Sequence, residues 1–175
     1  MLYHGSYIKE LPYIAANAKS HYTGKQVAYF TSDRVYALVC CRLPEENFVT
    51  MGIREDGKQH YFERFPNQLI TLYKGKKGFL YILDSNEGLV NTNNRTWESN
   101  VNVYVDRCEI VDDVYEEIKK EEEKGNIVIH KYEEIDSNEQ KAHANHIRDT
   151  IDDNKIMKPF YLKHFSSLWD KQQEF

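Results

Sequence analysis

The sequence lacks any apolar run near the roughly 18 residues that a membrane-spanning helix needs. Its first residues also lack the basic stretch and apolar stretch of a secretory signal peptide. Cysteine is scarce: Cys40, Cys41 and Cys108 form no C-x-x-C pair, which argues against a disulfide framework and a thiolate zinc site. We therefore expect a cytoplasmic protein without a membrane partner, in which the three cysteines are small buried apolar residues.

Two glycine-rich nucleotide motifs are also missing. The chain has neither G-x-G-x-x-G nor G-x-x-x-x-G-K-[ST], so nothing predicts a Rossmann or P-loop nucleotide site. What the chain does have is 41% hydrophobic residues, including 13 Tyr and 8 Phe, in a length of 175 residues. That is enough apolar surface for one ordinary domain with a sizeable core.

Short strands dominate the first two thirds of the chain. Alternating or β-branched runs predict strands at 2–6, 27–31, 70–75, 78–84, 101–111 and 127–132, and a hairpin around the Asp56-Gly57 turn. Helices are expected after Ser32, as N-cap, and from Asp112 or Asp113 to Gly125. Because strands and helices do not alternate regularly, the pattern indicates an α+β fold.

The last forty residues are expected to be helical. Residues 137–156 have helical periodicity, and an aromatic segment at 160–169 follows them. The expected organisation is a single domain over residues 1–175, with a core at 1–135 and a helical extension at 136–175 that packs on it.

The stretch "LYHGS" at 2–6, followed by "AYFTSDRVYAL" at 28–38, resembles the first two signature segments of the ADP-ribosyltransferase superfamily. The likeness is to its His-Tyr-Glu branch, which includes diphtheria toxin and the poly(ADP-ribose) polymerases. Small bacterial domains of unknown function share the "LYHGS" start and a Trp-x-Ser segment, here "RTWESNVNVYV". The resemblance implies two small, mostly antiparallel sheets that form a cleft for NAD, with flanking helices.

The resemblance also implies roles for particular residues. His4 would hydrogen-bond a ribose hydroxyl, the Gly5 backbone would pair with the nicotinamide amide, and Ser6 would add a hydrogen bond there. Tyr29 or Tyr36 would stack on the nicotinamide ring. Glu98, just before a predicted strand, is the positional match for the catalytic glutamate that stabilises the ribose cation, although Asn100 or Asn102 could occupy that place. NAD would be the substrate, and the acceptor an unknown protein or nucleic acid.

Three other readings stay open. A non-catalytic module could bind a nucleotide or a protein through the same groove. An RNA 2'-phosphotransferase-like enzyme would need several arginines to grip phosphate, for which Arg34, Arg54, Arg64 and Arg95 are available. The negative charge of residues 106–175, which have 11 basic and 18 acidic side chains, argues against RNA binding. Glu139, His143 and His146 have a spacing that could gather a metal ion on one helical face, but a solvated face explains it too.

Overall fold

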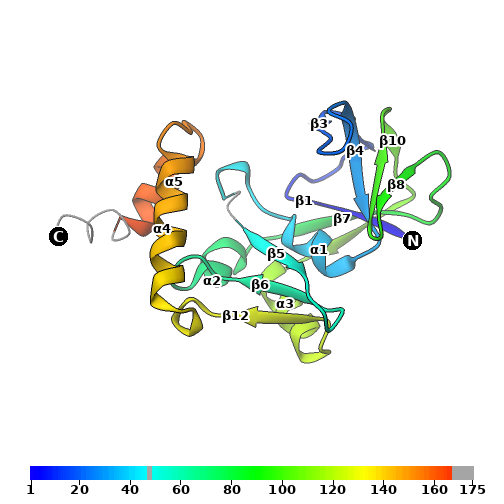
Figure 1. Cartoon of the computed structure of the whole chain (residues 1–175). Helices are drawn as coiled ribbons and strands as arrows, with labels where there is room; N and C mark the ends of the chain where they lie inside the picture. The colour runs from blue at the N-terminus through cyan, green and yellow to red at the C-terminus, as the bar shows by residue number, and fades with distance from the viewer. Residues whose placement is uncertain (47–48, 167–175) are drawn as a thin grey trace. The chain divides into compact units, whose positions relative to one another are not determined.

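The computed structural model describes residues 1–46 and 49–166. It is a mixed α+β structure with largely antiparallel sheets and, among the described residues, five α-helices (Figure 1). The chain divides into two compact units: unit 1 comprises residues 1–41 and 75–119, and unit 2 comprises residues 42–74 and 120–175. The expected organisation, a single domain with a core at residues 1–135 and a helical extension at 136–175, stays a prediction.

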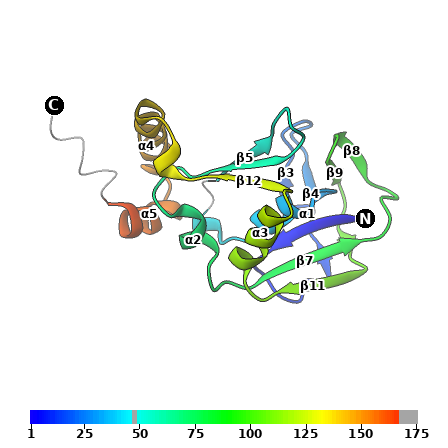
Figure 2. The ribbon, with the colours of Figure 1, turned by 90° about the horizontal axis from the view of Figure 1, so that it is seen from below.

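A seven-stranded sheet forms the body of unit 1. Its strand order is β11-β7-β1-β4-β9-β8, and β3 pairs with the free part of β4. The strands are β1 (Leu2–Ser6), β3 (Ala18–Lys19), β4 (Gln26–Thr31), β7 (Gly78–Leu83), β8 (Val90–Asn93), β9 (Thr96–Ser99) and β11 (Arg107–Val111). β1 therefore lies between β7 and β4, and β11, β7 and β1 run side by side (Figure 2). A separate pair, β2 (Tyr13–Ile14) and β10 (Val103–Tyr104), completes the strands of this unit.

The core of unit 1 is built on the side of the sheet that Phe30 faces. Its buried members come from β1, β2, β4 and β7 and are Leu2, Ile14, Ala28, Phe30, Phe79, Tyr81 and Leu83, with Trp97 packed against them. The predicted strands at 2–6, 27–31 and 78–84 are thus confirmed, while the predicted strand at 101–111 is divided into β10 and β11.

The helix α1 (Arg34–Val39) follows β4 directly. Its N-cap is Asp33, whose side chain accepts a hydrogen bond from the backbone N–H of Tyr36, so the expectation that Ser32 caps the helix was wrong by one residue. At the other helix of this part of the chain, α3 (Val114–Glu123), Asp113 accepts hydrogen bonds from the amides of Tyr115 and Glu116, as expected.

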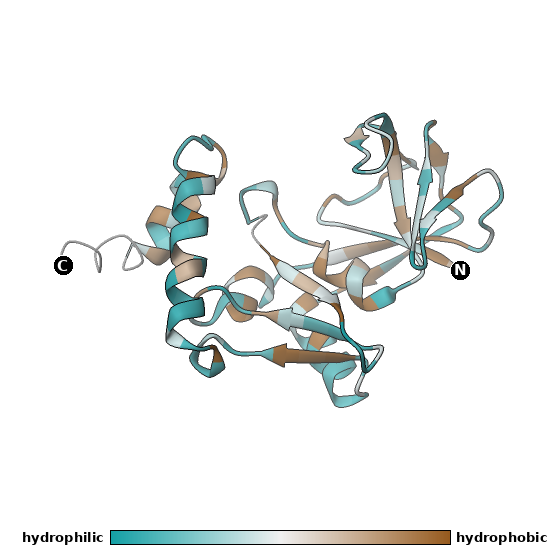
Figure 3. Cartoon of the chain, viewed as in Figure 1, coloured by the Kyte–Doolittle hydropathy of each residue, from teal (hydrophilic) through white to brown (hydrophobic). Residues whose placement is uncertain are grey.

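Among its described residues, unit 2 contains a three-stranded sheet, two 3-10 helices and three complete α-helices. β5 (Thr50–Ile53) and β6 (Gln59–Phe62) form the predicted hairpin, and β12 (Ile127–His130) pairs with β6 in parallel. The helices are α2 (Gln68–Tyr73), α4 (Ser137–Ile151) and α5 (Met157–Phe165), and the 3-10 turns lie at Pro44–Glu46 and Tyr132–Glu134. α4 is hydrophilic over most of its surface (Figure 3). Its buried residues and those of α5 pack with Phe65 in one cluster: Ile147, Ile151, Met157, Tyr161 and Phe165.

The predicted strand at 70–75 was wrong, because residues 68–73 form α2. The β-branched and aromatic composition favoured a strand, but Leu69, Leu72 and Tyr73 are buried at the spacing of one helical face. Glu63 also accepts a hydrogen bond from the amide of Leu69 at 2.8 Å, which satisfies an otherwise unpaired donor in the first turn.

The cysteines and the helix lengths complete the comparison with the sequence. Cys41 is buried as expected, whereas Cys40 is half-buried and Cys108 is exposed, so the expectation was wrong for Cys108. No helix in the described part of the chain is long and apolar enough to cross a membrane. Residues 167–169 of the predicted aromatic segment lie outside the described residues.

Candidate functional site

A cavity of about 610 Å³ opens in unit 1 beside β1 and β4. Its walls come from four stretches: residues 3–5 of β1, residues 21–31 up to the end of β4, α1, and the β8–β9 turn. Paired residues on neighbouring strands share one side of a sheet, and alternate residues along a strand do too. The register therefore puts one set on the side that α1 covers: Tyr3, Gly5, Tyr29, Thr31, Thr96 and Glu98.

His4 lies where β1 and β4 part. The two strands are paired at Tyr3 and Thr31, and the next backbone acceptor on β4, the carbonyl oxygen of Tyr29, lies 2.8 Å from Nδ1 of His4. Because a carbonyl oxygen can only accept, Nδ1 must carry the proton. Burial lowers the pKa of His4, against the opposing effect of that hydrogen bond, so the ring is neutral near pH 7.

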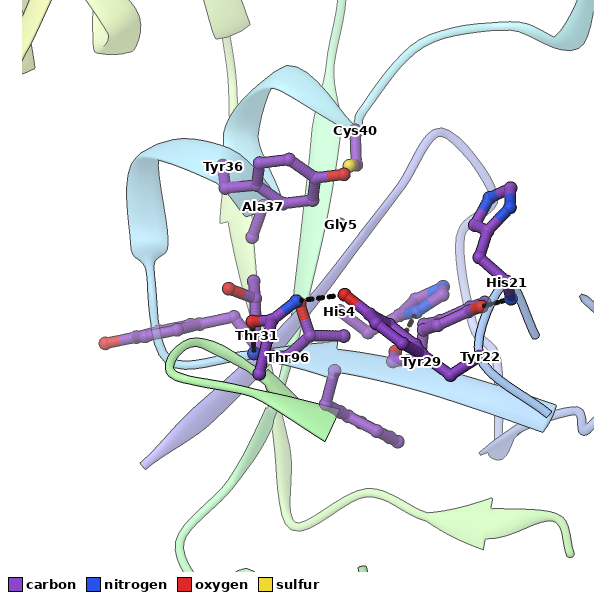
Figure 4. A pocket seen from close by; sticks show the side chains of 13 residues that line it. His4, Gly5, His21, Tyr22, Tyr29, Thr31, Tyr36, Ala37, Cys40 and Thr96 are labelled. Carbon is purple, nitrogen blue, oxygen red and sulfur yellow. Dashed lines mark hydrogen bonds between the residues drawn. The ribbon is translucent and has the colours of Figure 1, made fainter. Parts of the chain in front are cut away.

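The second ring nitrogen of His4 is then a hydrogen-bond acceptor. Among the described residues no side chain or backbone group bonds to Nε2 of His4, and His4 is one of the residues that line the cavity (Figure 4). A neutral imidazole in this tautomer presents a lone pair that suits a hydroxyl donor such as a sugar hydroxyl.

Gly5 allows α1 to approach β1 very closely. A Cβ atom built on Gly5 would lie 1.7 Å from the carbonyl oxygen of Ala37. A glycine at this position therefore lets the backbone of α1 come close to β1. The predicted pairing of the Gly5 backbone with a nicotinamide amide stays a prediction.

Both candidate tyrosines border the cavity, from different elements (Figure 4). Tyr36 lies on α1 and is 45% exposed. Tyr29 is held more firmly, since its hydroxyl accepts a hydrogen bond from the backbone N–H of His21 at 3.2 Å and donates to the carbonyl oxygen of Lys19 at 3.3 Å. Of the two rings, Tyr36 is therefore the more exposed.

Ser6 borders a second cavity. This space of about 380 Å³ is also lined by His4 and Tyr29 and, for the rest, mainly by apolar side chains of residues 8–18. The hydroxyl of Ser6 accepts a hydrogen bond from the amide of Ile8 at 3.0 Å. Ser6 is not among the described residues that line the larger cavity.

The side chain of Glu98 is buried and does not line the cavity. It is 4% exposed and is not among the described residues that line either cavity. Its Oε2 accepts a hydrogen bond from the hydroxyl of Ser20 at 2.9 Å, and its Oε1 is buried with no hydrogen-bond partner among the described residues. Of the two alternatives, Asn100 is exposed, and Asn102 accepts a hydrogen bond from the amide of Ala16 at 3.0 Å. The catalytic role of Glu98 stays a prediction.

Several cavity residues carried no signal in the sequence. His21 and Tyr22 come from a segment with no periodic pattern, and Asn93 lies in the polar turn before β9. Cys40 is the exception, because it follows Tyr36 by four residues on a predicted helix, and that spacing puts the two on one face. These residues add an imidazole, a phenol, an amide and a thiol to the site.

The arginines do not converge on the cavity. Arg34 pairs with Glu109 and, at 3.0 Å, with Glu117, and Arg95 lies 2.6 Å from Asp33. Neither of the two is among the described lining residues, and Arg54 and Arg64 belong to unit 2. Arg34 and Arg95 are therefore paired with carboxylates and do not line the cavity.

The suggested metal ligands on α4 do not form a cluster. Nε2 of His143 lies 3.6 Å from a carboxylate oxygen of Glu139, which is an ion-pair distance. Burial lowers the pKa of His143, and the nearby Arg64 charge adds to that effect. Within residues 1–46 and 49–166, no group of three or more His, Cys, Asp and Glu side chains could hold a metal ion.

Unit 2 has one further chain of titratable groups. Nε2 of His60 lies 3.1 Å from both carboxylate oxygens of Asp56, and its Nδ1 lies 2.8 Å from Nε2 of His130. Since a carboxylate accepts, Nε2 of His60 is the donor to Asp56. Burial lowers the pKa of His130, and the neighbouring His60 ring lowers it further. The sequence held no signal for this contact, because the two histidines are 70 residues apart.

The comparisons with known proteins add no family to this description. No protein-family model, no curated protein and no solved structure matches the chain. What can be argued about function therefore depends on the cavity and its residues.

Proposed function

We propose that the chain binds NAD in the 610 Å³ cavity and transfers ADP-ribose to an acceptor, on an ADP-ribosyltransferase-like fold. One observation supports this most: the His4-Gly5 pair and two tyrosines, Tyr29 and Tyr36, which the family resemblance selects from distant parts of the sequence, border one cavity. Its volume is within the range of about 300–1,000 Å³ that is typical of small-molecule sites.

The residues have the chemistry that the reaction needs. The bond between the nicotinamide nitrogen and the ribose carbon breaks, its electron pair leaves with neutral nicotinamide, and the acceptor bonds to the ribose carbon and loses a proton. Nε2 of His4 would accept a hydrogen bond from a ribose hydroxyl, and Tyr36 would stack on the nicotinamide ring. The bond that breaks joins the ribose to the nicotinamide ring. Because both would be held in place on binding, less entropy would be lost on the way to the transition state.

A second candidate is a module that binds a nucleotide without breaking it. The position of Glu98 favours this candidate. Its carboxylate accepts a hydrogen bond from Ser20, and Glu98 is not among the described residues that line the cavity. A cavity without a carboxylate at the ribose would retain binding but lose most of the stabilisation of the developing cation.

The test combines NAD binding with nicotinamide release. We expect NAD to raise the melting temperature of the chain, His4→Ala to abolish that shift, and His146→Ala, an exposed histidine on α4, to leave it unchanged. Release of nicotinamide together with ADP-ribose bonded to a component of an acceptor-rich extract identifies a transferase, release in water alone identifies hydrolysis of NAD, and a shift without release identifies the binding module. An unchanged melting temperature at millimolar NAD would contradict both candidates.

A further inference from the structure

Residues 20–25 form a tight turn that brings two side chains to the cavity. The amide of Ser20 donates to the carbonyl oxygen of Lys25 at 2.8 Å, and the amide of Gly24 donates to the carbonyl oxygen of Ser20 at 3.0 Å. His21 and Tyr22, which follow Ser20, both line the cavity, and the hydroxyl of Tyr22 accepts a hydrogen bond from the side-chain amide of Asn93 at 2.8 Å (Figure 4). We call residues 20–25 the Ser20 turn.

The hydroxyl of Ser20 holds this turn together. It accepts hydrogen bonds from the amides of Tyr22 at 3.2 Å and Thr23 at 3.1 Å, and it donates its single hydrogen to Oε2 of Glu98. A serine hydroxyl has one hydrogen and two lone pairs, so all three capacities are used. Glu98 fixes the direction of the hydrogen and thereby aims both lone pairs at the turn.

Glu98 is well placed to anchor the turn to the sheet. It sits on β9 directly opposite Tyr29 on β4, on the same side of the sheet. The hydroxyl of Tyr29 bonds to the backbone on both sides of Ser20, at Lys19 and His21. Ser20 is 3% exposed and Glu98 4%, so their hydrogen bond is shielded from water, and a hydrogen bond is electrostatically stronger inside a protein than in water.

We propose that Glu98 is a positioning residue: through Ser20 it holds the Ser20 turn, and His21 and Tyr22 on that turn contact the ligand. The role differs from direct contact between the carboxylate and the ribose, which the family resemblance implies. It rests on the proposed function for the identity of the ligand, NAD. An imidazole and a phenol on this wall suit the sugar hydroxyls and a flat ring of a dinucleotide.

Variants of Glu98 and Ser20 distinguish the positioning role of Glu98 from direct contact of its carboxylate with the ribose. Glu98→Gln retains an oxygen that accepts the Ser20 hydrogen, whereas Glu98→Ala and Ser20→Ala each remove the bond. We expect Glu98→Ala and Ser20→Ala each to speed amide exchange at Tyr22 and Thr23 by about 10-fold or more, and the double variant to add little to either. Glu98→Gln should stay within about 3-fold of the unsubstituted chain, since it retains the acceptor. The control is Ser99→Ala on the same strand: among the described residues the Ser99 hydroxyl bonds only to the backbone of Val101, so its loss should leave these amides unchanged.

The KM for NAD and the kcat for nicotinamide release test the positioning role, because a residue with a merely structural role would not change them in this way. We expect Glu98→Ala to raise KM for NAD by about 10-fold at similar kcat for nicotinamide release, with Glu98→Gln restoring KM. Unchanged exchange at Tyr22 and Thr23 in Glu98→Ala would overturn the proposal, and so would a Glu98→Gln variant with normal exchange but a kcat lowered 100-fold or more. If NAD neither binds nor reacts, the proposed function fails, while the exchange rates still decide whether Glu98 holds the turn.

Discussion

Replacing Gly5 with alanine tests the close approach of α1 to β1. The added methyl carbon would lie 1.7 Å from the carbonyl oxygen of Ala37 and 2.7 Å from its carbonyl carbon. Both are backbone atoms of a helix and cannot rotate away. The helix must therefore move by about 1.3 Å before the closest contact reaches 3.0 Å.

The magnitude follows from overpacking. Inserting a methylene group into a packed core usually costs about 1–3 kcal/mol, and a rigid backbone neighbour puts Gly5→Ala at about 3 kcal/mol or more. For a chain of this size that corresponds to a melting temperature lower by roughly 6–12 °C. Because Tyr36 and Cys40 line the cavity from α1, the shift should also weaken ligand binding.

The control is Gly52→Ala on β5. A Cβ atom there would meet nothing within 4 Å, so we expect the free energy of unfolding to change by less than about 1 kcal/mol. Urea denaturation followed by circular dichroism measures both variants. Equal stabilities of Gly5→Ala and Gly52→Ala would refute the packing argument and with it the location of α1 against β1.

Three further results are expected. Tyr81→Phe should cost about 1–3 kcal/mol in urea denaturation, because the hydroxyl accepts from the amide of Leu11 and donates to the carbonyl oxygen of Ile8; an unaffected midpoint would contradict those bonds. Since burial lowers the pKa of His4, the unfolded chain takes up this proton more readily, so stability is full above pH 6.5 and falls below it. Melting temperatures from pH 7.5 to 5.5 should therefore depend less on pH in His4→Gln, and equal slopes would contradict this. Phe65→Ala, at a fully buried position, should cost about 3–5 kcal/mol by the same denaturation assay, and a loss below about 1 kcal/mol would mean that the cluster is not packed.

Local pattern predicts the part of the site that lies on regular elements. β1, β4 and α1 follow from alternation, β-branched residues and a helix start expected at Ser32, one residue before the observed cap, and these elements carry His4, Gly5, Tyr29 and Tyr36. α2 shows the limit of the same reasoning, because its composition favours a strand while its burial pattern, fixed by tertiary contacts, is helical.

The Ser20 turn could not be found from sequence. Its geometry depends on hydrogen bonds to Glu98 and Tyr29, and Glu98 is 78 residues away in the chain. A local pattern carries no information about such a partner, so nothing in the sequence distinguishes His21 and Tyr22 from other loop residues. Where Glu98 points was equally hidden, since the same residue on the same strand fits either the ribose or the turn.

The order of the strands has a consequence for synthesis on the ribosome. β1 is made well before β7, yet β7 is one of its two neighbours, with Leu2 opposite Leu83 and Ser6 opposite Phe79. The hairpin of β5 and β6 and the helix α2 are translated in between. The imidazole at position 4 therefore leaves the exit tunnel before the strand that flanks it exists, and the pocket cannot be completed until β9 has been made.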